Sequence, residues 1–240
     1  MKVDVFIPCC IDQFAPQTGF NLIKLLNTAD LDLHYNPEQT CCGETFFRNG
    51  DFENAKKLAS QFMENLASSD YIVSASSSCV SFIKNHFEEL FYNSSYHNRC
   101  KEYINKTYDI ADFLVNILDK HQFNAALQKK AVLIEDRGIR NLYNQRKELK
   151  TLLSNVEGLE LVEIPQFETL PGSDFHFAND FEPVATHILQ QFLSAMQQTG
   201  ADTVISNDFR PLLNVESYCK KQAIPVNCLH IVDVLANGIE

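Results

Sequence analysis

One pattern of apolar runs occurs twice along the 240-residue sequence, and this repetition most constrains the fold. Short β-type runs alternate with longer segments whose apolar residues recur at helical spacing, and the order restarts near residue 131. The clearest internal match joins DYIVS at residues 70–74 to DTVIS at residues 202–206. Alternating strands and helices are typical of parallel sheets covered by helices. The sequence therefore predicts an α/β protein of two pseudo-repeated, Rossmann-like parallel-sheet domains.

The expected elements follow from the apolar periodicity. In the first half we expect strands at 3–7, 31–34 and 71–75, and helices at 19–27, 51–68, 80–91 and 101–121. After a linker at 123–128, we expect strands at 131–135, 159–164, 203–206 and 226–229, and helices at 142–155, 181–199 and 212–222. A last helix begins at His230, which we expect to cap it. The two domains are then 1–125 and 126–240.

Composition argues against several classes of partner and location. The net charge is −11, the pI is about 5.1, and no run of basic residues offers a footprint for nucleic acid. No stretch approaches the roughly 20 apolar residues that a membrane-spanning helix needs. The N-terminal run carries Asp4 within an apolar segment too short for a signal peptide. We expect a cytoplasmic protein.

Four cysteines follow the first three expected strands of the first half. Cys9 comes after the first strand, Cys41 and Cys42 after the second, and Cys79 after the third. Because the carboxyl ends of parallel strands meet at one edge of a sheet, we expect these sulfurs to lie together. Two adjacent cysteines before Gly43 suit thiolates held against one inorganic centre, and glycine lets the backbone approach them closely.

Three interpretations of this cysteine set remain open. An iron–sulfur cluster needs four thiolates, and these residues could supply them. A tetrahedral zinc site could use the same four, although zinc favours cysteine pairs that are spaced rather than adjacent. The loop could instead be an empty, structural or disulfide-forming segment.

The remaining cysteines, and the polar residues after the loop, have more ordinary expected roles. We expect Cys10 to point away from Cys9 and to pack, and Cys100 to be a surface or half-buried thiol. Cys219 and Cys228 lie beside apolar patterns and are predicted to pack in the core. Glu44 and Thr45 are placed to hydrogen-bond near the centre or to cap the next element. Nucleotide-binding and hydrolase motifs are absent from the sequence.

With these residues in place, the chain resembles the CCG-type cysteine-rich proteins from end to end. That family includes the lactate utilization A proteins, to which the chain is most similar, the iron–sulfur subunit of glycolate oxidase and the B subunit of heterodisulfide reductase. The matching stretches are residues 2–12, Gln39 to Gly43, Ser76 to Cys79, 156–165 and 225–235.

The resemblance implies two α/β domains facing a shared cleft, with iron–sulfur clusters at the Cys-Cys-Gly loops. It also implies a fifth cysteine three residues after Cys79, where this chain has Phe82. The cluster would then either have an open iron position or be an ordinary four-cysteine cluster.

The second half departs from the family pattern at its own cysteine positions. Where the family carries cysteine, this chain has Arg137, Leu170, Pro171 and Pro211, although Gly172 keeps the place of Gly43. None of the four can supply a thiolate. We therefore expect one cluster. Arg137 with Arg140 could bind an anion and Asp174 with His176 could form a new polar site, but we favour ordinary surface and loop roles for both pairs.

The function that the resemblance implies is an iron–sulfur electron-transfer subunit of a complex that oxidises lactate or another 2-hydroxy acid. It would hold one 4Fe-4S cluster on Cys9, Cys41, Cys42 and Cys79, with Gly43 shaping the loop, and it would work with other subunits of an oxidoreductase complex. The sequence identifies no catalytic residue. The alternatives are a non-redox assembly or regulatory subunit and a zinc-stabilised structural domain.

Overall fold

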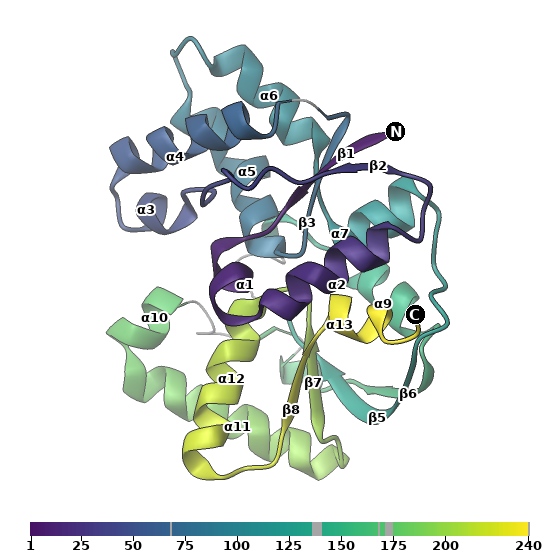
Figure 1. Ribbon diagram of the computed structural model, residues 1–240. Coiled ribbons are helices and arrows are strands. Elements are labelled where there is room, and N and C mark those ends of the chain that lie inside the picture. Colours follow the sequence, from purple (N-terminus) through teal and green to yellow (C-terminus); the bar gives the residue numbers. More distant parts are fainter. Residues whose placement is uncertain (68, 136–140, 168, 171–174, 240) are drawn as a thin grey trace. The chain divides into compact units, whose positions relative to one another are not determined.

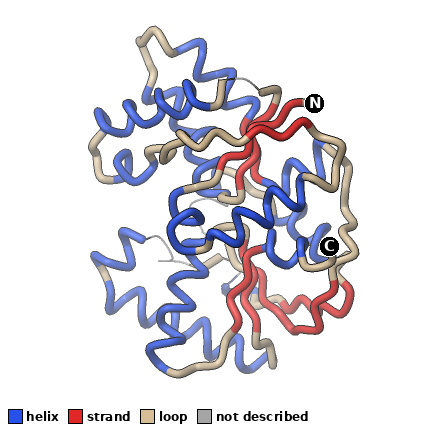
Figure 2. Tube along the Cα trace, viewed as in Figure 1, coloured by secondary structure: helices blue, strands red, loops and turns tan. Residues whose placement is uncertain are grey.

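The computed structural model describes residues 1–67, 69–135, 141–167, 169–170 and 175–239. The chain divides into two compact units, Met1–Phe113 and Leu114–Glu240. Each unit contains one four-stranded parallel sheet flanked by helices, as Figure 1 and Figure 2 show. The expected α/β class with repeated parallel sheets is confirmed. The predicted domain boundary between residues 125 and 126 stays a prediction.

The first unit builds the sheet β2-β1-β3-β4. Its elements are β1 (Lys2–Phe6), α1 (Cys9–Phe14), α2 (Pro16–Leu26), β2 (Asp32–His34), α3 (Glu44–Arg48), α4 (Phe52–Asn65), β3 (Tyr71–Ser74), α5 (Ser77–Leu90), α6 (His97–Lys106), β4 (Thr107–Asp109) and α7 (Ile110–Asp112). A π-helical turn, Phe113–Ile117, follows at the junction of the units.

Alternation along the strands places the core of the first unit on both faces of its sheet. Phe6 and Ile72 point to the face covered by α4, α5 and α6 and belong to one buried cluster with them. Phe62 on α4 lies at the centre of that cluster, with its ring edge-on to Phe6 at a centroid distance of 5.0 Å. On the opposite face, Val3 and Val5 are buried.

The second unit repeats this topology as the sheet β6-β5-β7-β8. Its elements are β5 (Ala126–Leu133), α9 (Arg146–Leu153), β6 (Glu157–Val162), the 3-10 turn Pro165–Phe167, α10 (Phe175–Asp180), α11 (Glu182–Thr199), β7 (Thr203–Ser206), α12 (Phe209–Gln222), β8 (Asn227–His230) and α13 (Ile231–Ala236). All ladders in both sheets are parallel. The internal repeat seen in the sequence is therefore a repeat of structure.

Two expected elements were wrong. The single helix predicted at 101–121 is interrupted by β4, which pairs with β3 from Ile72↔Thr107 to Ser74↔Asp109. The linker predicted at 123–128 overlaps β5, which begins at Ala126. In both places a strand forms because a neighbouring strand supplies its hydrogen bonds, and tertiary pairing of this kind leaves little local pattern.

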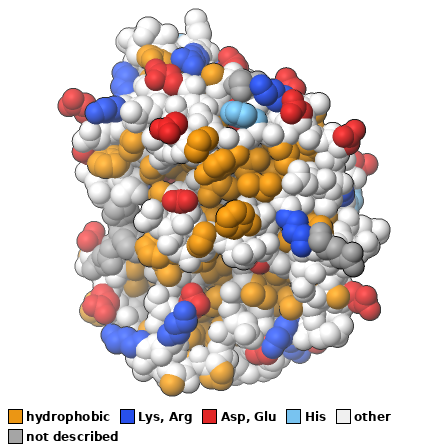
Figure 3. Space-filling model, viewed as in Figure 1, with side chains coloured by type: hydrophobic (Ala, Val, Ile, Leu, Met, Phe, Trp, Pro, Cys, Tyr) orange, Lys and Arg blue, Asp and Glu red, His pale blue; other side chains and the backbone are white. Residues whose placement is uncertain are grey.

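Within the described part of the chain, no helix has the length and apolar character needed to cross a membrane. On the face drawn in Figure 3, Lys and Arg side chains are dispersed among acidic ones.

Candidate metal centre

Cys9 stands at the carboxyl end of β1. It is the first residue of α1, and Pro8 is the N-cap with extended backbone angles of φ −64° and ψ 150°. Proline suits this position because its missing N–H would have no partner within the helix. The tight passage from strand to helix leaves Cys9 exposed at the edge of the sheet.

The loop before Cys41 is fixed to β1 by Gln39, for which the sequence pattern predicts no role. The backbone N–H of Ile7 donates to Gln39 Oε1 at 2.8 Å. The Gln39 side-chain amide donates in turn to the carbonyl oxygens of Val5 and Asn36. Beyond the end of the short strand β2, this side chain therefore takes the place of a further strand residue and holds the loop beside the sheet.

Gly43 turns the chain between Cys42 and Glu44. It is the N-cap of α3 and has a left-handed φ of +95°, and its N–H donates to Cys41 Sγ at 3.4 Å. A Cβ added there would stand 2.9 Å from the carbonyl oxygen of Ala55. Glycine is thus required both by the backbone conformation and by the close approach of α4.

Cys79 is the third residue of α5, at the carboxyl end of β3. Ser76 caps this helix and accepts a hydrogen bond from the Cys79 N–H at 3.4 Å. The 14-residue helix directs its N-terminus, the positive end of its dipole, toward this thiol. Cys79 and Cys42 are both buried, with 7% and 1% of their surfaces exposed.

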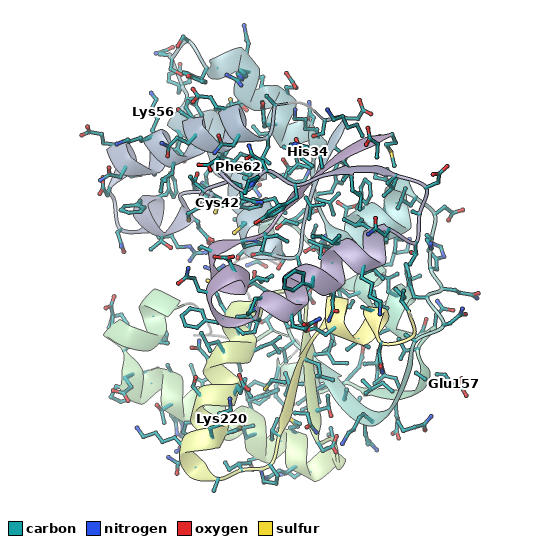
Figure 4. The ribbon with its side chains drawn as sticks, viewed as in Figure 1. His34, Cys42, Lys56, Phe62, Glu157 and Lys220 are labelled. Atoms are coloured by element: carbon teal, nitrogen blue, oxygen red, sulfur yellow. The ribbon has the colours of Figure 1, made fainter. Side chains whose placement is uncertain are left out.

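The four sulfurs lie together. Cys9 Sγ and Cys41 Sγ are 3.8 Å apart, and Cys42 hydrogen-bonds to the thiols of Cys41 and Cys79. The Cys42 and Cys79 sulfurs and a carboxylate oxygen of Glu44 all lie within 4.8 Å of one another. Figure 4 labels Cys42 near the start of α3. The parallel topology thus brings the cysteines to one edge, while their role as ligands stays a prediction.

Crowding makes the thiols of Cys9 and Cys42 hold their protons. Hydrogen bonds with Cys10 and Cys41 raise the pKa of Cys9, and hydrogen bonds with Cys41 and Cys79, with burial, raise the pKa of Cys42 well above its usual value. A helix N-terminus alone would lower a thiol pKa. At Cys9, the first residue of α1, neighbouring thiols outweigh that effect, because several thiolates so close together would repel one another. A bound cation would offset this repulsion between thiolates.

The donor set fits a metal centre. Four tetrahedral sulfurs around a single Zn²⁺, at about 2.3 Å each, stand roughly 3.8 Å apart, which is the separation of Cys9 from Cys41. In a cluster the thiolates bind different irons and stand further apart. Cys9 can move outward because it is exposed, and Cys41 lies in an irregular loop. In addition, Thr40 Oγ1 beside Cys41 is buried with no hydrogen-bond partner in the described chain, and such a hydroxyl suits a sulfur acceptor.

Two expectations for the other cysteines were wrong. Cys10 does not point away from Cys9, because residues 9–14 form a helix rather than a strand or turn, and the Cys10 thiol hydrogen-bonds to Cys9. Cys100 is fully buried in the core of the first unit rather than at the surface. Packing roles are confirmed for Cys219, which is buried, and for Cys228, which packs against the core of the second unit.

The second unit has no thiol at the two described counterpart positions. Pro211 is the third residue of α12, as Cys79 is of α5, and Leu170 is buried in the core. The other residues that we singled out there, Arg137, Arg140, Pro171, Gly172 and Asp174, lie outside the described residues, and the His176 side chain is likewise not described.

Buried polar residues gather at the same edge of the second sheet. Arg146 pairs with Glu135 at 3.0 Å, and Asn207 donates to Gln145 Oε1 at 2.8 Å. His230 ends β8 and caps α13 by accepting from the Val232 N–H, as expected. In the second unit, pairs of polar side chains therefore lie at the sheet edge that corresponds to the cysteine-bearing edge of the first unit.

Comparison with known proteins establishes the relationship. Lactate utilization protein A 2 of Bacillus cereus (strain AH820) is 31% identical over 240 residues, covering 100% of this chain and 99% of that protein. The chain belongs to the lactate utilization protein A family. Lactate utilization protein A of Halalkalibacterium halodurans is 31% identical over 235 residues, covering 98% and 96% of the two chains. The family model CCG, a cysteine-rich domain, matches residues 3–84, which include Cys9, Cys41, Cys42 and Cys79.

Two solved structures resemble this member of the lactate utilization protein A family distantly. A putative Asp/Glu racemase from Yersinia pestis aligns with a TM-score of 0.41 at 14% identity, covering 99% of this chain and 96% of that one. Glutamate racemase from Francisella tularensis aligns with a TM-score of 0.38 at 13% identity, covering 98% and 78%. Similarity at this level carries no argument about function.

Proposed function

We propose that this protein is an iron–sulfur electron-transfer subunit of a cytoplasmic lactate oxidation system. Cys9, Cys41, Cys42 and Cys79 would hold one cluster, and Gly43 would shape the loop. The observation that carries the proposal is the meeting of these four sulfurs in a chain related over its whole length to proteins named lactate utilization protein A. Such a cluster, when bound, supplies one-electron oxidation and reduction.

The surrounding residues suit the holding of an anionic sulfur centre. The Gly43 N–H already donates to Cys41 Sγ, and α5 begins beside Cys79. Such donors and helix dipoles stabilise thiolate charge. Phe82 and Phe47, with ring centroids 5.3 Å apart, pack in or against the same buried cluster as Cys42 and Cys79. Low polarity and hydrogen bonds to sulfur are the features through which a protein sets the potential of such a centre.

Exposure at the site is uneven, and this favours electron exchange with a partner. Cys42 and Cys79 are buried, whereas Cys9 is exposed. A partner subunit would therefore approach from the side of Cys9 and α1. Because Leu170 and Pro211 replace cysteines in the second unit, we propose that this chain carries one centre and that other subunits of the complex provide the remaining redox steps.

A single zinc ion is the second candidate, and one specific distance favours it. The Cys9–Cys41 separation of 3.8 Å equals the edge of a zinc–sulfur tetrahedron, about 3.8 Å. A zinc site would make the first unit a metal-stabilised structural domain with no electron-transfer role. The two candidates differ in metal identity, in bound sulfide and in colour.

The test is metal and sulfide analysis of the full chain purified and reconstituted without oxygen. The proposal predicts about four irons and four acid-labile sulfides per chain, with visible absorption. Cys42→Ser should lose most of this iron, while Cys228→Ser, which changes a thiol in the second unit, should retain it. One zinc per chain without sulfide would overturn the proposal in favour of the structural site.

A further inference from the structure

Glu44 is a buried carboxylate at the cysteine site. Only 6% of its surface is exposed, and one of its oxygens lies within 4.8 Å of the sulfurs of both Cys42 and Cys79. A buried carboxylate is costly unless it is paired or binds a metal. Arg48 pairs with one carboxylate oxygen of Glu44, and a carboxylate oxygen also lies beside the two sulfurs, where a metal would meet it.

The backbone fixes this carboxylate beside the thiols. Glu44 is the first residue of α3, directly after the left-handed turn at Gly43. That turn is held against Ala55 of α4, so Cys42 and Glu44 are placed by the same rigid feature. The position of Glu44 is thus fixed by the backbone, whereas the position of an acidic side chain on the surface is not.

Arg48 supports the carboxylate from one turn further along α3. Its Nε donates to Glu44 Oε1 at 2.8 Å, and its side chain is 36% exposed while that of Glu44 is 8% exposed. The ion pair orients Glu44, as a partner of a metal-binding carboxylate commonly does. An ionised carboxylate can bind iron or zinc through oxygen.

Phe82 lies in the same buried cluster as Cys42 and Cys79 but offers no donor atom. It is 3% exposed and packs against Phe47 at 5.3 Å and Phe87 at 5.6 Å between ring centroids. Phe82 therefore cannot bind a metal. Among the described residues, Glu44 places a carboxylate oxygen beside the sulfurs of Cys42 and Cys79.

We propose that Glu44 is an oxygen ligand of the metal centre, and that it would bind one iron as a fifth protein ligand in addition to the four cysteines. The inference rests on the proposed function, because it assumes an iron centre there. Binding by a hard, anionic oxygen would distinguish one iron from the others, which bind sulfur alone. Oxygen ligation would also favour the oxidised state and so lower the reduction potential of the centre.

The test is ⁵⁷Fe Mössbauer spectroscopy and potentiometry of the reconstituted full chain, with Glu44→Gln as the variant. In the wild type, about one quarter of the iron absorption should carry the larger isomer shift of an oxygen-bound site. Glu44→Gln should lose that component and raise the midpoint potential. Glu53→Gln, which neutralises an exposed acid in the first turn of α4, should change neither.

Each outcome separates the inference from the proposed function. An all-sulfur spectrum in the wild type overturns the role of Glu44 and leaves the cluster intact, and this reading does not depend on whether the variant folds. A shifted potential with an unchanged spectrum in Glu44→Gln also overturns ligation, because it shows that the carboxylate acts through its charge alone. A wild-type protein that takes up no iron overturns the proposed function and the inference together.

Discussion

Substitution of Gly43 by alanine tests how the Cys-Cys-Gly loop is held. The φ of +95° lies in the left-handed region, where an L-residue costs about 1–2 kcal/mol. The added Cβ would also stand 2.9 Å from the Ala55 carbonyl oxygen and 3.4 Å from Leu58 Cβ. Since Ala55 is fully buried in α4, relief requires backbone movement, and overpacking of this kind costs about 1–3 kcal/mol.

Gly50 provides a matched control in the same unit. Its φ is +76°, but an added Cβ would meet nothing within 4 Å. Gly50→Ala should therefore lose only the conformational part, about 1–2 kcal/mol, while Gly43→Ala should lose about 2–5 kcal/mol. The chain has no tryptophan, so guanidinium unfolding of the metal-free protein is best followed by far-ultraviolet circular dichroism.

The same pair of variants separates stability from metal binding. Relief of the Ala55 contact must displace Gly43 and with it Cys42 and Glu44, so iron uptake should fall in Gly43→Ala and stay at the wild-type level in Gly50→Ala. Equal losses of stability and equal iron contents in the two variants would refute this account of the loop.

Three further predictions concern the core, a buried ion pair and pH. Phe62→Ala should destabilise the chain by about 3–5 kcal/mol in the same unfolding assay, because the ring is buried among Phe6 and two other aromatic rings. Arg146→Met should cost about 3–5 kcal/mol by removing the guanidinium from buried Glu135, and adding Glu135→Leu should recover most of that loss; no recovery would refute the pairing. Because the pKa values of Cys9 and Cys42 are raised, Zn²⁺ affinity in chelator-buffered titrations should increase with pH by about tenfold per pH unit for each proton displaced, and a pH-independent affinity would contradict it.

Much of the fold could be predicted because buried parallel strands leave a continuous apolar signal. β7 was predicted at its observed bounds, Thr203–Ser206, and β3 within one residue. β4 was missed because Thr107, Tyr108 and Asp109 form a short strand with no apolar run, and only their pairing with β3 defines it. The short helices α1 and α3 are similarly too brief to show periodicity.

In the candidate site, too, some features could be predicted from the sequence and others depend on tertiary contacts. Topology alone predicted that Cys9, Cys41 and Cys79 would share one edge, since that follows from the order of the strands. The inward position of Glu44 depends on the φ of Gly43, and the anchoring of the loop depends on hydrogen bonds of Gln39 to β1. No sequence pattern encodes contacts of this kind, which arise only when the loop meets the sheet.

The central claim is that the four thiols of the first unit hold an iron–sulfur cluster. Anaerobic reconstitution followed by iron and sulfide analysis tests it most directly, with Cys42→Ser and Cys228→Ser analysed in parallel. We predict about four irons and four sulfides for the wild type and Cys228→Ser, and a loss of most of both in Cys42→Ser. Equal iron in all three proteins, or zinc without sulfide in the wild type, would contradict the account.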